Sequence, residues 1–113
     1  LKALPIIPPD RLSDGEEQAS HMVPLRLVRG PIPLREHLRR LEQEDRDAWQ
    51  AMVKERKGWT HHTQTALALY WADGSRSVLE IGDLVELESG QRDIELLVNY
   101  FRLLDKLDFV TLL

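Results

Sequence analysis

The chain has 113 residues, of which 42% are hydrophobic and 30% charged, and it contains no cysteine. This length accommodates one domain with a single modest core. Without cysteine, the chain has no disulfide, no thiolate nucleophile and no cysteine-type zinc site. The net charge of −4 argues against a general polyanion binder, and no run of about 18 apolar residues predicts a membrane span.

The charge is unevenly distributed along the chain. Residues 1–23 carry two bases and four acids, residues 24–63 nine bases and six acids, and residues 64–113 four bases and nine acids. The basic part of the chain therefore lies in the middle, and the C-terminal part is acidic. Because there is no cysteine and no signal-peptide pattern after Leu1, we expect a cytoplasmic location.

Residues 1–22 are expected to form an extended arm or a linker from an upstream domain. Pro5, Pro8 and Pro9 remove backbone donors and favour extended or polyproline conformations. A chain that begins with leucine is also consistent with a fragment of a longer protein. Three apolar side chains of the arm are available to dock on a neighbouring surface; they are Leu4, Ile6 and Ile7.

The next two segments are predicted to be a strand and a broken helix. Apolar residues alternate in the first half of residues 23–33, which favours an edge strand, and Gly30-Pro31 ends it. Residues 34–57 have helical apolar spacing on both sides of a polar stretch at 42–47. Arginines in this part form a basic segment, but interleaved glutamates favour an ordinary charged helix over a nucleic-acid patch. These arginines are Arg26, Arg29, Arg35, Arg39 and Arg40.

A further helix is predicted over residues 60–73. Apolar bulk at Ala66–Trp71 supplies its buried side, and Asp73-Gly74 ends it. Ser77 and Glu80 then match the capping-box pattern, in which each side chain satisfies a free backbone donor of the other residue.

Two amphipathic helices, 78–87 and 92–106, are joined by a turn that contains Gly90, and a strand is predicted at 109–113. This order predicts a mainly helical α+β fold of the winged-helix, helix-turn-helix class, with a small sheet. The expected domain covers residues 23–113 and follows the N-terminal arm.

The last strand is expected to pair with residues 23–28 or with residues around Arg76, and to offer an edge for strand addition. The helical spacing also predicts which side chains are buried. They are Leu67, Tyr70, Trp71, Ile81, Leu84, Val85, Leu87, Ile94, Leu97, Val98, Phe101, Leu104 and Phe109.

DNA binding is the alternative function, and it would use the helix 92–106 in the major groove. The residues that would contact DNA are Gln91, Arg92, Asn99 and Arg102. However, the outer side of this helix carries three bases against three acids, which is a solvated face and not a phosphate-binding stripe. An interaction module is therefore favoured over a DNA-binding regulator.

Catalytic, cofactor and metal sites are not predicted. The sequence has no Gly-x-Ser-x-Gly elbow, no phosphate-binding glycine loop and no His-Glu-x-x-His motif. His61-His62 is the one histidine pair, and no third ligand stands at metal-ligand spacing. The tryptophans Trp49, Trp59 and Trp71 are expected to pack in the core and between helices.

Residues 69–113 resemble the C-terminal winged-helix segment of some bacterial zinc aminopeptidase-like proteins. The residues that carry the resemblance are Trp71, Asp73, Gly74, Arg76, Leu79, Glu80 and Ile81. The resemblance implies a non-catalytic accessory module, because the metal ligands of such a peptidase would lie in an upstream domain. We therefore predict a module for protein–protein interaction or oligomerisation, whose partner is an upstream domain or a second copy in a homo-oligomer.

Overall fold

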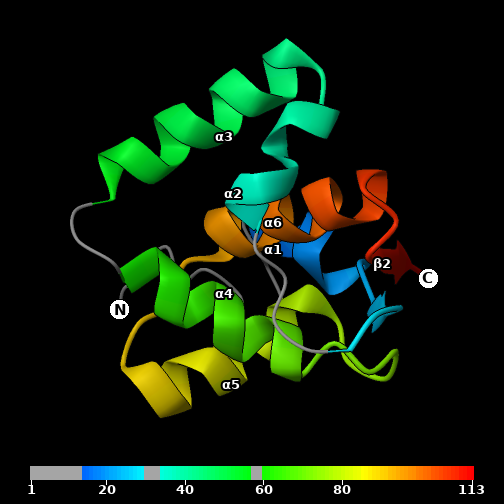
Figure 1. Cartoon of the computed structure of the whole chain (residues 1–113). Coiled ribbons are helices and arrows are strands. Elements are labelled where there is room, and N and C mark those ends of the chain that lie inside the picture. Colours follow the sequence, from blue (N-terminus) through cyan, green and yellow to red (C-terminus); the bar gives the residue numbers. More distant parts are fainter. Residues whose placement is uncertain (1–13, 30–33, 57–59) are drawn as a thin grey trace.

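The computed structural model of the protein describes residues 14–29, 34–56 and 60–113 (Figure 1). The fold is mainly helical with a small antiparallel sheet of two strands. No helix in the described ranges is long and apolar enough to cross a lipid bilayer. The elements in chain order are α1 (Asp14–Ser20), β1 (Pro24–Arg26), α2 (Leu34–His37), the 3-10 turn η1 (Leu38–Arg40), α3 (Gln43–Glu55), α4 (Thr60–Tyr70), α5 (Val78–Ser89), α6 (Ile94–Lys106) and β2 (Val110–Leu112).

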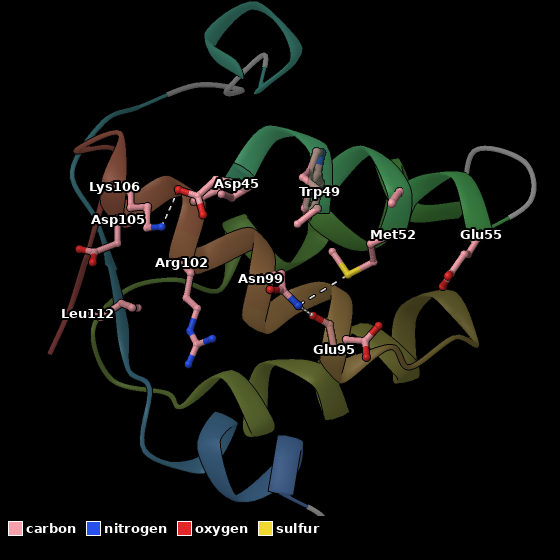
Figure 2. Close-up of a pocket in the computed structure, with 13 residues that line it drawn as sticks. Asp45, Trp49, Met52, Glu55, Glu95, Asn99, Arg102, Asp105, Lys106 and Leu112 are labelled. Atoms are coloured by element: carbon pink, nitrogen blue, oxygen red, sulfur yellow. Dashed lines mark hydrogen bonds and ion pairs between the residues drawn. The ribbon is translucent and has the colours of Figure 1, made fainter. Parts of the chain in front are cut away.

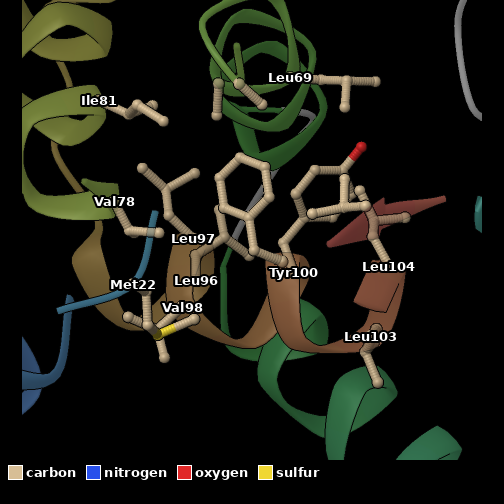
Figure 3. Close-up of a cluster of buried hydrophobic side chains, with 14 of the residues drawn as sticks. Met22, Leu69, Val78, Ile81, Leu96, Leu97, Val98, Tyr100, Leu103 and Leu104 are labelled. Carbon is tan, nitrogen blue, oxygen red and sulfur yellow. The ribbon is translucent and has the colours of Figure 1, made fainter. Parts of the chain in front are cut away.

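Helix α6 lies at the centre of the molecule, in contact with α1, α3, α4, α5 and β2 (Figure 1). Its apolar spacing is strong, and most of its circumference is buried. Figure 3 shows how its side chains meet those of the surrounding elements. The buried residues of α6 are Ile94, Leu96, Leu97, Val98, Tyr100, Phe101, Leu103 and Leu104. Only a narrow stripe of this helix therefore faces outward.

The capping box predicted at the start of α5 is confirmed. The Glu80 backbone N–H donates to Ser77 Oγ at 3.2 Å, and the Ser77 backbone N–H donates to Glu80 Oε1 at 2.9 Å. These two bonds satisfy donors that the first turn of a helix otherwise leaves free. At the other end, Gly90 adopts a left-handed conformation with φ of 78° and ends the helix.

The strand pairing predicted for the end of the chain is confirmed. β1 and β2 are antiparallel, with Leu25 opposite Thr111. Leu25 also forms a single bridge to Asp73 on its other side, so β1 lies between two segments. In the described part of the chain, β2 pairs with β1 alone and is therefore an edge strand of the sheet.

The structure differs from the expected extended arm at residues 14–22. Residues 14–20 form α1, and Ala19 and Met22 are buried against the core. One small and one flexible apolar side chain are enough to dock this short helix on α5 and α6, and so few residues give no clear period in the sequence. Residues 1–13 of the predicted arm lie outside the described residues.

Two side chains predicted to be buried are exposed. Tyr70 is 73% exposed, because the last turn of α4 directs it outward against the edge of Trp71. Leu87 is 82% exposed, because it lies about 200° around α5 from the buried Val85, on the opposite side of the helix. Conversely, three buried residues of α6 were missing from the predicted core, because α1 and α3 cover flanks of α6 that were expected to be free. They are Leu96, Tyr100 and Leu103.

Candidate functional site

The outward stripe of α6 is the surface that a DNA-reading helix would present, and α3 lies along one side of it (Figure 2). The two helices run in opposite directions. Asp45, near the start of α3, accepts from Lys106 Nζ at 2.6 Å near the end of α6. At the other end of the contact, Arg56 after α3 pairs with Asp93 before α6. Polar contacts therefore join α3 to α6 at both ends.

Arg56 is the most connected of these side chains. Its Nη2 donates to Asp93 Oδ1 and to Glu95 Oε1, each at 3.1 Å, while Nε donates to Asp93 Oδ2. Its Nη1 also donates to the Met52 carbonyl at 2.9 Å, which satisfies the end of α3. The hydrogen bonds to Asp93 raise the pKa of Arg56, although burial opposes the shift. Burial disfavours the charge of Asp93, but its bonds to Arg56 and to the Leu96 N–H lower the pKa of this carboxyl overall.

Asp93 has a second role as the N-cap of α6. Its Oδ1 accepts from the Leu96 backbone N–H at 3.1 Å. The helix predicted from residue 92 therefore begins at Ile94. The Asp93 carboxylate thus caps the central helix and also binds Arg56 at the end of α3.

Two of the candidate DNA contacts are engaged before α6 begins. Gln91 accepts from Gln64 Nε2 at 3.3 Å. Arg92 pairs with Asp83 of α5 and with Glu16 of α1, each at 3.1 Å. Arg92 therefore joins two helices within the molecule and has its charge matched by two carboxylates.

The other two candidates lie on α6 itself. Asn99 Nδ2 donates to the Glu95 carbonyl at 2.8 Å and approaches Met52 Sδ of α3 at 3.6 Å. Arg102 is exposed and has no ion-pair partner among the described residues. Of the four candidates, Arg102 alone keeps a charge that is available to an external phosphate.

A groove of about 730 Å³ opens between α3 and α6. Glu55 and Glu95 lie at one end, and Lys106 with Leu112 at the other (Figure 2). Apolar side chains of both helices form its floor, and charged groups form its rim. The remaining lining residues are Asp45, Ala48, Trp49, Ala51, Met52, Asn99, Arg102, Leu103 and Asp105.

The outer face of the sheet is a second surface of interest. Because side chains alternate along a strand, Pro24 and Val110 point to the core, and their neighbours Leu25 and Thr111 point away from it. Leu27 and Leu113 continue this outer face and are 51% and 63% exposed. Aliphatic side chains on both strands thus meet solvent on one side of the sheet.

Gly74 allows these side chains to close over the turn beside the sheet. Its φ is 84°, and a Cβ placed on it would stand 3.1 Å from Leu25 Cδ1 and 3.6 Å from Leu113 Cδ1. Asp73 fixes the same turn by accepting from the Ser75 N–H at 3.0 Å and from Arg76 Nη1 at 2.8 Å. The bonds from Ser75 and Arg76 lower the pKa of this carboxyl. The Asp-Gly-x-Arg pattern is therefore accounted for by turn formation.

An aromatic corner borders the outer face of the sheet. Tyr70 and Leu27 both line one shallow hollow in the surface. The Trp71 ring meets Tyr70 edge-on at 5.2 Å, and Arg76 lies over the same ring at 4.9 Å. Trp71 Nε1 donates to Glu88 of α5 at 2.7 Å. Trp71 is thus a packing residue, as predicted, although only half-buried.

The basic segment does not form one patch in the part of the chain that is described. Arg26 Nε donates to the Val28 carbonyl at 2.5 Å, and Arg40 lies over the Phe109 ring at 5.8 Å. Arg29 and Arg39 are exposed, and the side chain of Arg35 lies outside the described part. The side chains of His61 and His62, and Trp59, are outside it as well. Within it, no three His, Asp or Glu residues are grouped as a metal site would require.

Sequence patterns missed both surfaces for different reasons. The groove forms because α3 docks beside α6. The helical spacing of Trp49 and Met52 predicted which side of α3 is buried, but it did not predict the helix that covers this side. The outer sheet face had a clearer signal, since Leu25 and Leu27 alternate with residues that point inward. This alternation was used to predict a strand, but which of its faces is buried depends on the rest of the fold.

Comparison of the chain with protein-family models, with curated proteins and with solved structures finds no match. The likeness of residues 69–113 to a peptidase-associated segment therefore stays a prediction.

Proposed function

We propose that this chain is a non-catalytic module of winged-helix type that acts through protein–protein contacts. The topology supports this fold assignment, since α4, the bridging residue Asp73, α5, α6 and β2 follow the helix–strand–helix–helix–strand order of such domains. β1 then pairs between Asp73 and β2 and completes the small sheet.

The proposal rests mainly on the contacts that the polar side chains of the outward stripe of α6 make within the molecule. A recognition helix needs free cations and amides to contact phosphates and bases. Here Arg92 and Lys106 are paired with carboxylates of other helices, and Asn99 contacts its own helix and α3. Helix α3 also lies along the side of α6 by which a DNA groove would have to approach (Figure 2). The polar groups of this stripe therefore hold the module together.

The exposed apolar groups favour a protein partner. Leu27 on the outer sheet face lines one hollow with the exposed Tyr70, and Leu113 on the same face is also exposed. Clustered apolar side chains and an exposed aromatic residue are typical of protein contact surfaces. We propose that the outer sheet face makes the contact, with a second copy of the chain or with an upstream domain. An upstream peptidase domain is the partner that the likeness of residues 69–113 suggests.

Sedimentation velocity over a concentration series tests self-association. We expect the average mass to rise with concentration and to stay high at high salt, because the contact is mainly apolar. Leu27→Asp should return the chain to a monomer. Leu87→Asp is the matched control, because Leu87 is an exposed leucine of α5 and not of the sheet, and it should leave the mass unchanged.

A titration with duplex DNA at low salt tests the alternative function. We expect no binding. Binding that weakens steeply with salt and is reduced by Arg102→Ala would support DNA recognition and count against the proposal. A chain that stays monomeric at every concentration and binds DNA in this way would overturn it.

A further inference from the structure

The groove between α3 and α6 has an apolar floor that is open to solvent. Ala48 and Ala51 of α3 line it and are exposed, and Met52 beside them is half-buried. Leu103 of α6 and Leu112 of β2 add aliphatic surface. Small alanine side chains allow another backbone to approach closely, and a thioether adapts to the shape of the surface it contacts. This floor therefore suits the apolar side of a partner.

The two helices that form the groove favour a helix as the occupant. Because α3 and α6 use their backbone groups in their own hydrogen bonds, neither offers the free edge that strand addition needs. An extended segment would place unpaired backbone groups against the apolar floor, which is unfavourable. A helix satisfies its own backbone groups and can lay an apolar side into a groove. The lining residues of α3 extend from Asp45 to Glu55, which is about 15 Å or nearly three helical turns.

One end of the groove is negatively charged. Glu55 at the end of α3 and Glu95 in the first turn of α6 lie there, with 77% and 69% of their side-chain surface exposed (Figure 2). Arg56 approaches both carboxylates but also pairs with Asp93, so the described side chains at this end are three carboxylates and one guanidinium. The negative end of α3 and the positive end of α6 meet here, so their dipoles oppose each other and the side chains determine the charge.

The charges at the other end of the groove are more nearly balanced. Lys106 donates to Asp45 at 2.6 Å, and the exposed residues Arg102 and Asp105 have opposite charges. A helix that lies along the groove therefore gains most from cations at the end that reaches Glu55 and Glu95. The phosphates of DNA and of anionic lipids would be repelled from that end.

We infer that the groove between α3 and α6 binds an amphipathic helix of a partner protein, whose basic residues lie against Glu55 and Glu95. About three turns of this helix lie in the groove, and its apolar side chains rest on Ala48, Ala51 and Met52. This inference goes beyond the proposed function, because none of the residues of the outer sheet face lines the groove.

Two peptides that differ only in charge test the kind of partner. Both are helix-forming and about four turns long, with leucines at helical spacing on one side. The polar side carries lysines in the first peptide and glutamates in the second. We expect the lysine peptide to shift the NMR signals of Ala48, Ala51 and Met52, and to bind about tenfold or more tightly than the glutamate peptide. Equal affinities, shifts confined to other residues, or no binding of the lysine peptide would overturn the inference.

Glu55→Lys tests the charged end of the groove. The Glu55 side chain is mostly exposed, so its replacement should leave the fold intact. It should weaken binding of the lysine peptide by about fivefold or more, because a repulsion replaces an attraction. Glu86→Lys is the matched control, since Glu86 is an exposed glutamate of α5 that does not line the groove. Equal weakening by the two variants would show that overall charge attracts the peptide, and it would contradict the inference.

Ala48→Gln tests the apolar floor. A longer, polar side chain on the floor should weaken binding of the lysine peptide by about fivefold or more, because it hinders close packing of the peptide's leucines. Ala66→Gln is the matched control, since Ala66 is an exposed alanine of α4 outside the groove. If the two variants bind the peptide equally well, the groove is not the binding surface.

A second copy of the chain is the other occupant to be tested. If Ala48→Gln abolishes self-association in sedimentation velocity, the groove binds a second copy, and the inference of a separate partner is wrong. The proposal for the outer sheet face is tested by Leu27→Asp in the same measurement. The two can therefore fail independently.

Discussion

Arg56 and Asp93 lie 37 residues apart in the chain, and their paired hydrogen bonds fasten the end of α3 to the start of α6. We expect Arg56→Ala to lower the free energy of unfolding by about 1–3 kcal/mol, because it leaves a half-buried carboxylate without its main partner. Denaturant unfolding measures the loss. Arg46→Ala within α3 removes a similar side chain that forms no ion pair with the described residues, and it should change stability by less than about 0.5 kcal/mol. Equal losses in the two variants would show that the pair contributes nothing.

The lowered pKa of Asp93 predicts an acid-dependent part of the stability. The group binds a proton more readily in the unfolded chain, so its contribution is present above the unfolded pKa, near 3.8, and is lost as pH falls through the lower folded pKa. Asp93→Asn should therefore be less stable than the natural chain at neutral pH. The difference should shrink as pH falls from about 4 toward the lower folded pKa of Asp93, below which both chains are uncharged at this position. Unfolding curves at a series of pH values measure it, and a constant difference would contradict the assignment.

Tyr100 predicts the opposite dependence at alkaline pH. Burial raises the pKa of its phenol to about 12, although Arg26 acts against this shift. The unfolded chain ionises first, so stability is full below about pH 10 and is lost as pH rises toward the folded value. Two pKa units correspond to about 2–3 kcal/mol. Tyr100→Phe should lack this loss, so its advantage over the natural chain should grow between about pH 10 and pH 12.

Phe101 is fully buried at the centre of the core, and truncation should be costly. We expect Phe101→Ala to destabilise the protein by about 3–5 kcal/mol, because the lost contacts leave a cavity that the neighbouring side chains fill only in part. Thermal and denaturant unfolding both report this change. Leu87→Ala removes an exposed aliphatic side chain and should cost under about 0.5 kcal/mol. A loss below about 1 kcal/mol for Phe101→Ala would show that the side chain is not part of the core.

Local signals predicted the C-terminal half well. The Ser77–Glu80 pattern, the glycine after α5 and the helical spacing of α6 depend on residues close together in the chain, and such patterns decide where helices begin and end. The pairing of the last strand with residues near Leu25 was also predicted, because two short apolar segments had few other partners.

The missed features all depend on contacts between distant parts of the chain. Ala19 and Met22 are too few apolar residues to form a helical period in the sequence, so the docking of α1 was not predicted. The match of Arg56 to Asp93 is visible only once α3 lies beside α6. For the same reason, Asn99 was expected to face solvent freely, and the structure places it against Met52 of α3. Asn99 and Arg102 thus lie on the outer side of α6, whereas Gln91 and Arg92 precede this helix, and the partners of these side chains could not be inferred.

The sheet joins segments that a ribosome makes at very different times. Residues 24–26 are synthesised before residues 110–112. β1 therefore gains its second partner only once residues 110–112 have been made. Helices α5 and α6 can form from local signals in the meantime, so the nascent chain would hold structured helices beside an unpaired, leucine-bearing strand. The sheet is therefore expected to be the last part of the molecule to form, and chains stopped before Val110 should depend most on chaperones.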